Sequence, residues 1–175
     1  MDLTIDVEDY KLNIRSTGII IHNNKLLTHK DMNYDHYALI GGRIQIGEDS
    51  ETTFKREILE EMGKEVEILG YVGTIENFFE HKSQKYHEIM FIYNAEFVNE
   101  QDKKIEETIQ NIEGEDHLKY EWIDLDKIDE YNLLPVAVKE ILKKGEFPVH
   151  KINIDKKEVK KWWILEKQKK HLNNI

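Results

Sequence analysis

The side chains of this sequence that could do chemistry are concentrated in residues 42–63. Within that segment, Arg56 is followed closely by Glu57, Glu60 and Glu61. On an α-helix, residues three and four positions apart lie on one face, so we expect the three carboxylates to point the same way. Like charges at that spacing destabilise a helix by about 0.2–0.5 kcal/mol a pair. A purely structural helix therefore gains nothing from this arrangement.

A divalent cation would turn the repulsion among these glutamates into binding. Mg²⁺ takes oxygen ligands, keeps several waters and usually lies between one or two carboxylates and the phosphates of a substrate. The cluster therefore predicts a Mg²⁺ site, with Mn²⁺ as a substitute. The sequence has no cysteine, and its histidines show no paired spacing for zinc ligation.

The segment resembles the signature of the Nudix hydrolases, G-x5-E-x7-R-E-U-x-E-E-x-G-U, in which U is a bulky aliphatic residue. The final aliphatic position is Lys64 here, and Ile40 stands where the family commonly has proline before the paired glycines. Neither difference removes a carboxylate. The residues that match the signature are Gly42, Glu48, Arg56, Glu57, Ile58, Glu60, Glu61 and Gly63.

The resemblance implies a pyrophosphohydrolase that cleaves a nucleoside diphosphate linked to another group, such as a nucleoside triphosphate, a nucleotide sugar or a dinucleotide. It implies that Glu57, Glu60 and Glu61 are metal ligands, and that Glu57 or Glu60 also orients or deprotonates water. It further implies that Arg56 pairs with Glu48 and holds the preceding loop and the helix in register.

Three further positions are candidates for contact with the metal or the substrate. Gly42, in the turn expected before the helix, would let the backbone approach a metal or a phosphate closely. Arg43 could contact phosphate, and an ordinary surface arginine is the alternative. Many relatives add one carboxylate from a loop beyond the signature, and Glu115 is the first candidate here, ahead of Glu113 and Asp116. A merely acidic, solvated loop is the alternative for each of them.

The competing functional class is a non-catalytic nucleotide-binding or regulatory Nudix-like module. Such modules usually lose one or more signature carboxylates, whereas this chain keeps them all, which favours the hydrolase. The auxiliary patterns that mark particular substrates are missing. The only prolines are Pro135 and Pro148, far from the signature. The sequence therefore does not identify the nucleotide.

The signature must be carried by a helix with one face anchored in the core. Ser50 can cap a helix over residues 51–62, and the glycine that follows is a natural stop. Phe54, Ile58 and Met62 recur every fourth residue and form an apolar stripe along this helix. The carboxylates are then left on another face.

Strands are predicted on both sides of that helix, because β-branched and aromatic residues concentrate in short runs there. The predicted strands cover residues 17–21, 25–28, 37–40, 66–74, 89–98 and 120–125. The first two flank His22-Asn23-Asn24 as a hairpin, a second helix is expected from Pro135 to residue 144, and residues 99–116 are mostly loop. This order agrees with the α/β fold that the resemblance implies, an α/β/α sandwich with a mixed β-sheet and the helix of the signature.

Length and composition predict one domain. The chain has 175 residues, enough for one sizeable core. We expect residues 1–155 to form a single Nudix hydrolase domain. Residues 156–175 are a basic segment with Trp162 and Trp163, expected to pack on that domain. The alternative is that the segment guides a polyphosphate or a single-stranded nucleic acid to the site.

Charge and hydropathy indicate the partners. The formal net charge is −10, which repels a polyanion at long range, so a phosphate substrate must arrive with, or meet, a cation. The resemblance implies a small nucleotide diphosphate derivative as substrate. Because the chain has only one short basic segment, we expect no duplex nucleic acid as a partner. No apolar run approaches the roughly 20 residues that span a bilayer, and the first residues lack the pattern of a signal peptide. We therefore expect a cytoplasmic protein that does not enter membranes. Whether two copies form a homodimer is left open.

Overall fold

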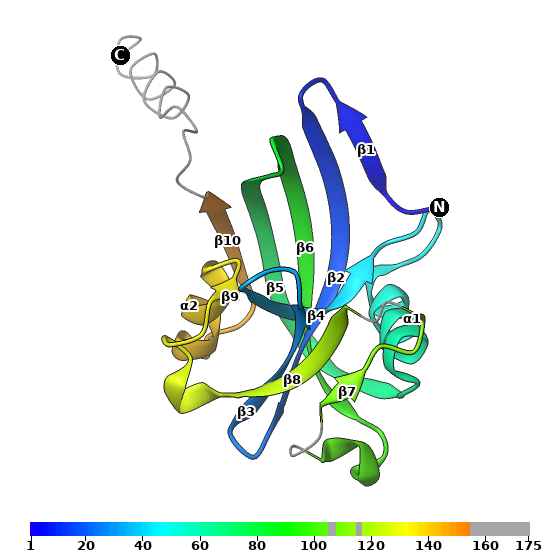
Figure 1. Ribbon diagram of the computed structural model, residues 1–175, viewed down its shortest axis with the longest axis vertical. Helices are drawn as coiled ribbons and strands as arrows, with labels where there is room; N and C mark the ends of the chain where they lie inside the picture. The colour runs from blue at the N-terminus through cyan, green and yellow to red at the C-terminus, as the bar shows by residue number, and fades with distance from the viewer. Residues whose placement is uncertain (105–107, 115–116, 155–175) are drawn as a thin grey trace.

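The structure is a computed structural model that describes residues 1–104, 108–114 and 117–154. In this part of the chain, a mixed ten-stranded sheet has the strand order β10-β5-β6-β2-β4-β3-β8-β7, with β1 beside β2 and β9 beside β4. Figure 1 shows α1 and α2 on opposite sides of the sheet. The helices are α1 (Ser50–Met62) and α2 (Ala137–Lys144). The strands are β1 (Thr4–Val7), β2 (Tyr10–His22), β3 (Lys25–Asp31), β4 (Tyr37–Arg43), β5 (Val66–His81), β6 (Gln84–Phe97), β7 (Ile109–Gln110), β8 (Leu118–Asp124), β9 (Leu133–Leu134) and β10 (Val149–Ile154).

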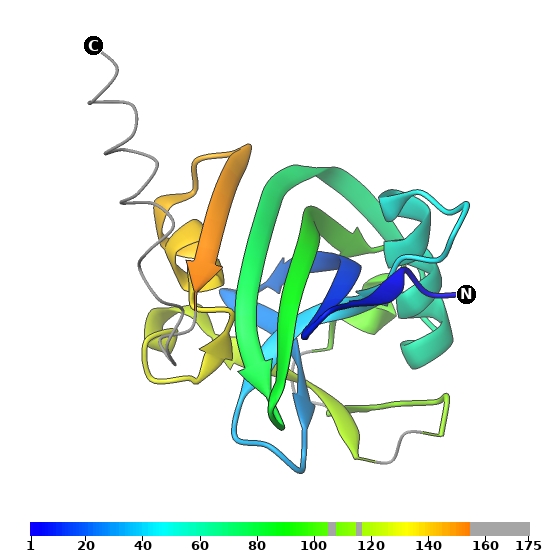
Figure 2. The same ribbon diagram turned by 90° about the horizontal axis from the view of Figure 1, so that it is seen from above.

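The sheet has a hydrophobic cluster on each face, because side chains alternate along a strand. Ile19 packs in one cluster and its neighbour Ile20 in the other. The first cluster includes Val138 and Ile141 of α2, and the second includes residues of α1. Figure 2 shows the two helices on either side of the long strands. The predicted α/β/α sandwich is therefore confirmed.

Helix α1 is anchored as its apolar spacing predicts. Phe54, Ile58 and Met62 are all buried on the face that packs against the sheet. Phe54 lies directly over Gly18 of β2, where an added Cβ would lie 2.0 Å from the ring atom Cζ. The helix can lie this close to the sheet because position 18 has no side chain.

The N-terminal end of α1 differs by one residue from the prediction, and the C-terminal end agrees with it. The cap is Asp49 and not Ser50, since the Asp49 carboxylate accepts a hydrogen bond from the Thr52 backbone N–H at 2.9 Å. Ser50 is the first helical residue, and its hydroxyl lies 2.6 Å from the Tyr93 hydroxyl. At the other end, Gly63 adopts the predicted left-handed stop, with φ 66°.

The structure has more strands than the sequence predicts, and several of the predicted strands are longer than expected. The hairpin at Asn23-Asn24 is present, but β2, β5 and β6 run well beyond the predicted residues. The second helix starts at Ala137, after the predicted Pro135. Strands β1, β7, β9 and β10 were not predicted. Two of them are only two residues long, and β10 pairs in parallel with β5, far away in the sequence.

Two expectations concern the end of the chain and membranes. The basic segment 156–175 lies outside the described residues. Among the residues that are described, no helix combines the length and the apolar character needed to cross a bilayer.

The contact between Gly18 and Phe54 gives a test of the core. We expect Gly18→Ala to lower the free energy of unfolding by about 1–3 kcal/mol, because the new methyl group overpacks a fully buried ring. Gly70→Ala is the matched control, since an added Cβ in that strand meets nothing within 4 Å. Urea unfolding of both variants measures the difference. Equal stability of the two would show that Phe54 can move aside freely.

Candidate active site

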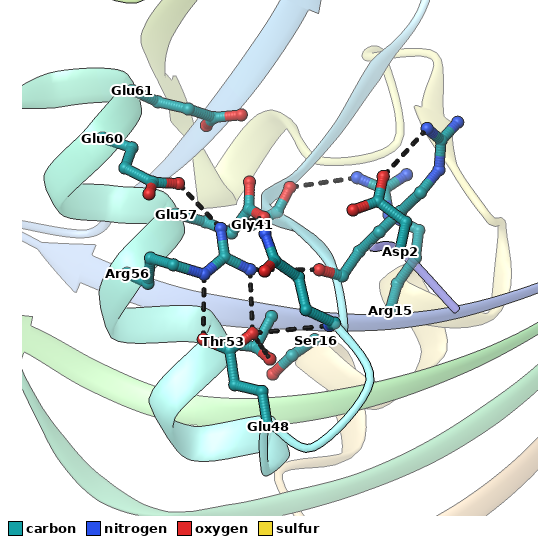
Figure 3. Close-up of polar contacts among 12 residues, drawn as sticks. Asp2, Arg15, Ser16, Gly41, Glu48, Thr53, Arg56, Glu57, Glu60 and Glu61 are labelled. Atoms are coloured by element: carbon teal, nitrogen blue, oxygen red, sulfur yellow. Dashed lines mark hydrogen bonds and ion pairs between the residues drawn. The ribbon is translucent and has the colours of Figure 1, made fainter. Parts of the chain in front are cut away.

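The loop between β4 and α1 is tied to the helix by the predicted Arg56–Glu48 pair. Arg56 donates from Nε to Glu48 Oε1 and from Nη2 to Glu48 Oε2, both at 2.9 Å (Figure 3). Thr53 donates to the same carboxylate at 2.8 Å. The hydrogen bonds from Arg56 hold the pKa of Glu48 down at about 2. Glu48 is therefore ionised over the whole physiological range and keeps the loop in place.

The remaining N–H groups of Arg56 also point at protein oxygens. Nη1 donates to Glu57 Oε1 and to Glu60 Oε2, each at 2.7 Å, and Nη2 donates to the carbonyl of Arg43 at 3.2 Å. A guanidinium has five N–H donors, and these contacts with those to Glu48 use them all. Arg56 thus organises the carboxylates.

Gly42 lies against the carboxylate of Glu57. A Cβ at position 42 would lie 2.0 Å from Glu57 Oε2, so any other residue would displace that carboxylate. The expectation that Gly42 belongs to a turn is wrong, because it pairs with Ser16 inside β4. The absence of a side chain at Gly42 leaves room for Glu57 of α1, whereas a Cβ at Gly41 would meet the backbone of β2.

Glu61 turns toward a different partner from the other two glutamates. The buried Tyr120 of β8 donates its hydroxyl to Glu61 Oε2 at 2.8 Å and itself accepts from Asn111 at 3.0 Å. Burial raises the pKa of Glu61 to about 7 and also raises the pKa of Glu57. The glutamates share one side of the helix as predicted, but Glu57 and Glu60 converge on Arg56 while Glu61 does not.

These glutamates suit a divalent cation chemically, although no preassembled group of three acidic or histidine ligands exists among the described residues. All the donors are carboxylate oxygens, which Mg²⁺ and Mn²⁺ prefer. The raised pKa values of Glu57 and Glu61 show that two of the carboxylates are partly desolvated without full compensation by a positive charge. A cation held by Glu57, Glu60 and Glu61 would supply it.

The residues predicted to contact the substrate have different outcomes. The side chain of Arg43 is 51% exposed and pairs with Asp2 at 3.6 Å. Glu115 and Asp116 lie outside the described residues. Glu113 is exposed, and its charge contributes to the raised pKa of Glu61, so it lies on the same side of the molecule as the helix carboxylates.

Arg15 lies beside the carboxylate cluster, and no pattern in the sequence predicted a role for it. It lies on β2, donates from Nη2 to the Gly41 carbonyl at 3.0 Å and pairs through Nη1 with Glu88 at 3.9 Å. Its Nε is buried without a hydrogen-bond partner in the described part of the chain. Its positive charge opposes the rise that burial causes in the pKa of Glu57 and of Glu61. The rarity of arginine in this lysine-rich chain was the only signal that could have singled it out.

A cavity of about 270 Å³ opens beside Arg15. It lies between the inner face of β5 and β6 and the segments that precede β4 and α2. Its walls combine one cation, two histidines, two carboxylates, aromatic rings and apolar side chains. The lining residues are Arg15, Tyr34, His36, Ala38, Asn77, Phe79, Glu80, His81, Glu88, Met90, Leu134 and Pro135.

Comparison with known proteins gives a family match and structural similarities. Residues 12–145 match the family model described as NUDIX domain. A search of curated proteins found no match.

Three solved structures illustrate the structural likeness. A UDP-X diphosphatase is 17% identical, with a TM-score of 0.57, over 79% of this chain and 66% of that chain, just under two thirds of its length. A MutT protein from Methanosarcina mazei Go1 is 20% identical, with a TM-score of 0.55, over 79% and 95%. An ADP-ribose pyrophosphatase from Streptococcus suis 89-1591 is 12% identical, with a TM-score of 0.55, over 81% and 98%. These likenesses show a shared fold.

The Arg56 network predicts that lysine cannot replace this arginine. We expect Arg56→Lys to lower the free energy of unfolding by about 1.5–3 kcal/mol, because one ammonium cannot hold Glu48 through two parallel hydrogen bonds and also reach Glu57 and Glu60. Arg43→Lys, at an exposed arginine, is the control and should change stability by less than about 0.5 kcal/mol. Chemical unfolding measures both, and an unchanged Arg56→Lys variant would contradict this account.

The low pKa of Glu48 predicts a pH dependence. Because the folded pKa of about 2 lies below the ordinary value of 4.5, the pair stabilises the protein above pH 4.5 and this contribution is lost as the pH falls toward 2. We expect Glu48→Gln to cost on the order of 1–3 kcal/mol near neutral pH. The gap to the wild type should shrink on acidification, as unfolding at several pH values would show. A gap that stays constant below pH 4.5 would exclude the ion pair as its cause.

Proposed function

The chain belongs to the Nudix hydrolase family, since the NUDIX domain model matches residues 12–145, and from that premise we propose that it hydrolyses the pyrophosphate linkage of a nucleoside diphosphate joined to another group. The observation that carries the proposal is the complete set of signature carboxylates on α1, framed by Arg56. Two of these carboxylates share one guanidinium nitrogen at 2.7 Å. Clustered carboxylates repel one another and destabilise the helix, so a non-catalytic binding module would gain nothing by keeping all of them.

The proposed reaction is attack of water on a phosphorus atom of the pyrophosphate bridge. Glu57, Glu60 and Glu61 would hold Mg²⁺, or Mn²⁺ in its place. When bound, this cation would neutralise charge that develops on the bridging oxygens and lower the pKa of water, which is worth several kcal/mol. Phosphoryl transfer depends mainly on positioning and electrostatic stabilisation. The absence of a nucleophilic serine or cysteine from the described site agrees with that chemistry.

The residues around the carboxylates then divide into those that act on water and those that position them. Glu57 or Glu60 orients the attacking water and takes its proton. Arg56 is a positioning residue, because all of its N–H groups are directed to Glu48, the two glutamates and a backbone carbonyl. Glu48 fixes Arg56 in turn. Gly42 leaves the space in which the Glu57 carboxylate lies.

The proposed substrates are nucleoside triphosphates, nucleotide sugars and dinucleotides. The names of the similar structures, UDP-X diphosphatase and ADP-ribose pyrophosphatase, support this range and belong to those proteins. Such small nucleotides and Mg²⁺ occur together in the cytoplasm, where we propose that the protein acts. Its net charge of −10 disfavours duplex nucleic acid as a partner. Dimer formation stays a prediction, which sedimentation of the purified chain would test.

Chromatographic separation of the products formed from a panel of these nucleotides tests the proposed function, because cleavage of the bridge yields a nucleoside monophosphate together with pyrophosphate or a second phosphate ester. We expect hydrolysis of at least one member with Mg²⁺ or Mn²⁺ and complete loss of activity in excess chelator. Turnover that survives the chelator would overturn the role of the metal. Nucleotide binding without any metal-dependent turnover would favour the alternative, a non-catalytic regulatory module.

Substitution of the glutamates separates metal binding from folding. We expect Glu60→Gln and Glu61→Gln to lower kcat by about 100-fold or more and to weaken the rise in melting temperature that Mg²⁺ causes. In chelator Glu61→Gln should be as stable as the wild type or slightly more so, because burial disfavours the charge of Glu61. Glu60→Gln loses an ion pair with Arg56 at a partly exposed position and should lower the free energy of unfolding by no more than about 1 kcal/mol. Glu51→Gln, on the exposed first turn of the same helix, is the control and should retain full activity.

Loss of activity in Glu51→Gln to the same extent would show that the effect is not specific to the signature. Unchanged kcat in both glutamate variants would remove them from the site.

A further inference from the structure

We propose that the cavity beside Arg15 binds the nucleoside end of the substrate and selects a base that presents two neighbouring N–H donors, as guanine does. This inference rests on the proposed function, which it extends to the chemistry of the base. It is carried by Glu88 and Arg15, the two charged residues that pair in the wall of the cavity.

Arg15 connects the cavity to the carboxylate helix. Its Nη2 is held by the carbonyl of Gly41, and Gly42, the next residue, lies against the Glu57 carboxylate. Figure 3 shows Arg15 beside Gly41, on the side of the glycines that faces away from Arg56. A nucleotide with its base in the cavity would therefore have its phosphates beside Arg15, within reach of the helix.

Glu88 is a buried carboxylate with unused capacity to accept hydrogen bonds. It is only 4% exposed. Oε1 accepts one long hydrogen bond, from Asn77 Nδ2 at 3.3 Å, and the Arg15 guanidinium lies 3.9 Å from Oε2. An ionised carboxylate offers about four acceptor sites, so most of these have no donor from the described residues. Leaving a buried charge with so few partners is costly, and a ligand that donates N–H groups would relieve that cost.

The neighbouring polar side chains do not supply the missing hydrogen bonds to the Glu88 carboxylate. Asn77 accepts from Asn153 at 2.8 Å through its Oδ1, which directs its amide nitrogen to Glu88. Asn13, opposite Glu88 on β2, has a buried Oδ1 with no hydrogen-bond partner in the described part of the chain. Of these polar side chains, Glu88 and Asn77 line the cavity, and the carboxylate of Glu88 is the acceptor that they offer to a ligand.

The remaining walls suit a flat heterocycle. Phe79 stacks on Tyr86 with ring centroids 4.7 Å apart, and Tyr34 packs edge-on against His81 at 5.1 Å. Both Phe79 and Tyr34 line the cavity. Its volume of about 270 Å³ is close to the lower limit of about 300 Å³ for typical ligand pockets, which suits a base better than a whole dinucleotide.

The two charged residues then impose different requirements on a ligand. The N1–H and N2–H groups of guanine can form two parallel hydrogen bonds to a carboxylate, in the way an arginine does. Adenine would direct the lone pair of N1 at the same carboxylate, and hypoxanthine offers only one of the two donors. The Arg15 side chain is 25% exposed, and its Nη1, which lies 3.9 Å from Glu88 and so beyond hydrogen-bond distance, would donate to a phosphate oxygen.

Binding of nucleoside monophosphates in chelator tests this inference without turnover. We expect the wild-type protein to bind GMP at least about ten-fold more tightly than IMP or AMP, since a bidentate pair typically discriminates between bases by that much or more. GMP and IMP differ only by the N2 amino group. Equal affinities for GMP and IMP would overturn the proposal with no variant involved.

Variants assign the discrimination to particular side chains. Glu88→Gln should abolish the preference for GMP over IMP, whereas Glu80→Gln, at the more exposed glutamate of the same cavity, should keep it. Arg15→Lys should weaken GMP binding more than guanosine binding and leave the base preference intact. A Glu88→Gln variant that is folded, by circular dichroism, and still prefers GMP would overturn the role of Glu88.

The outcomes also separate this inference from the proposed function. Metal-dependent hydrolysis of nucleotides without a preference for guanine would overturn the inference and leave the function standing. Selective GMP binding without hydrolysis of any nucleotide in the panel would do the reverse.

Discussion

The five hydrogen bonds of Arg56 fix the positions of the other groups in the site. They tie the loop that carries Glu48 to α1 and hold Glu57 and Glu60 side by side on one nitrogen. Without that cation, the carboxylates would repel one another and turn toward water. The same contacts leave Arg56 no free donor for a substrate, so recognition of phosphate must come from another residue.

The close packing of α1 on the sheet makes this network possible. Gly18 lets the Phe54 ring lie on β2, and Gly42 lets the Glu57 carboxylate lie on β4. The two glycines thus let the helix approach the strands closely at two points, the apolar contact with Phe54 and the polar contact with Glu57. The result is a carboxylate cluster on a rigid helix, with Glu57 and Glu61 partly desolvated. Desolvation strengthens the binding of any cation that arrives there.

Arg15 occupies the position between the two functional regions. It lies on the strand next to the paired glycines, and its charge acts on the carboxylates of α1 as well as on Glu88 in the cavity wall. Positive charge on that side offsets part of the acidic character of the site. The proposed anionic substrate would meet this positive charge although the net charge of the protein is −10.

The sequence by itself determined the helix and its buried face, because these depend on residues close together in the chain, and its resemblance to the Nudix signature predicted the pairing of Arg56 with Glu48. Spacing of three and four residues fixes which side chains share a face, and Gly63 ends the helix by its own backbone preference. Only the tertiary structure decided that the Ser50 hydroxyl meets Tyr93 of β6, that Gly42 lies in a strand and that Arg15 meets Glu88. The pairing of Arg15 with Glu88 depends on β2 lying parallel to β6, a register that no local pattern specifies.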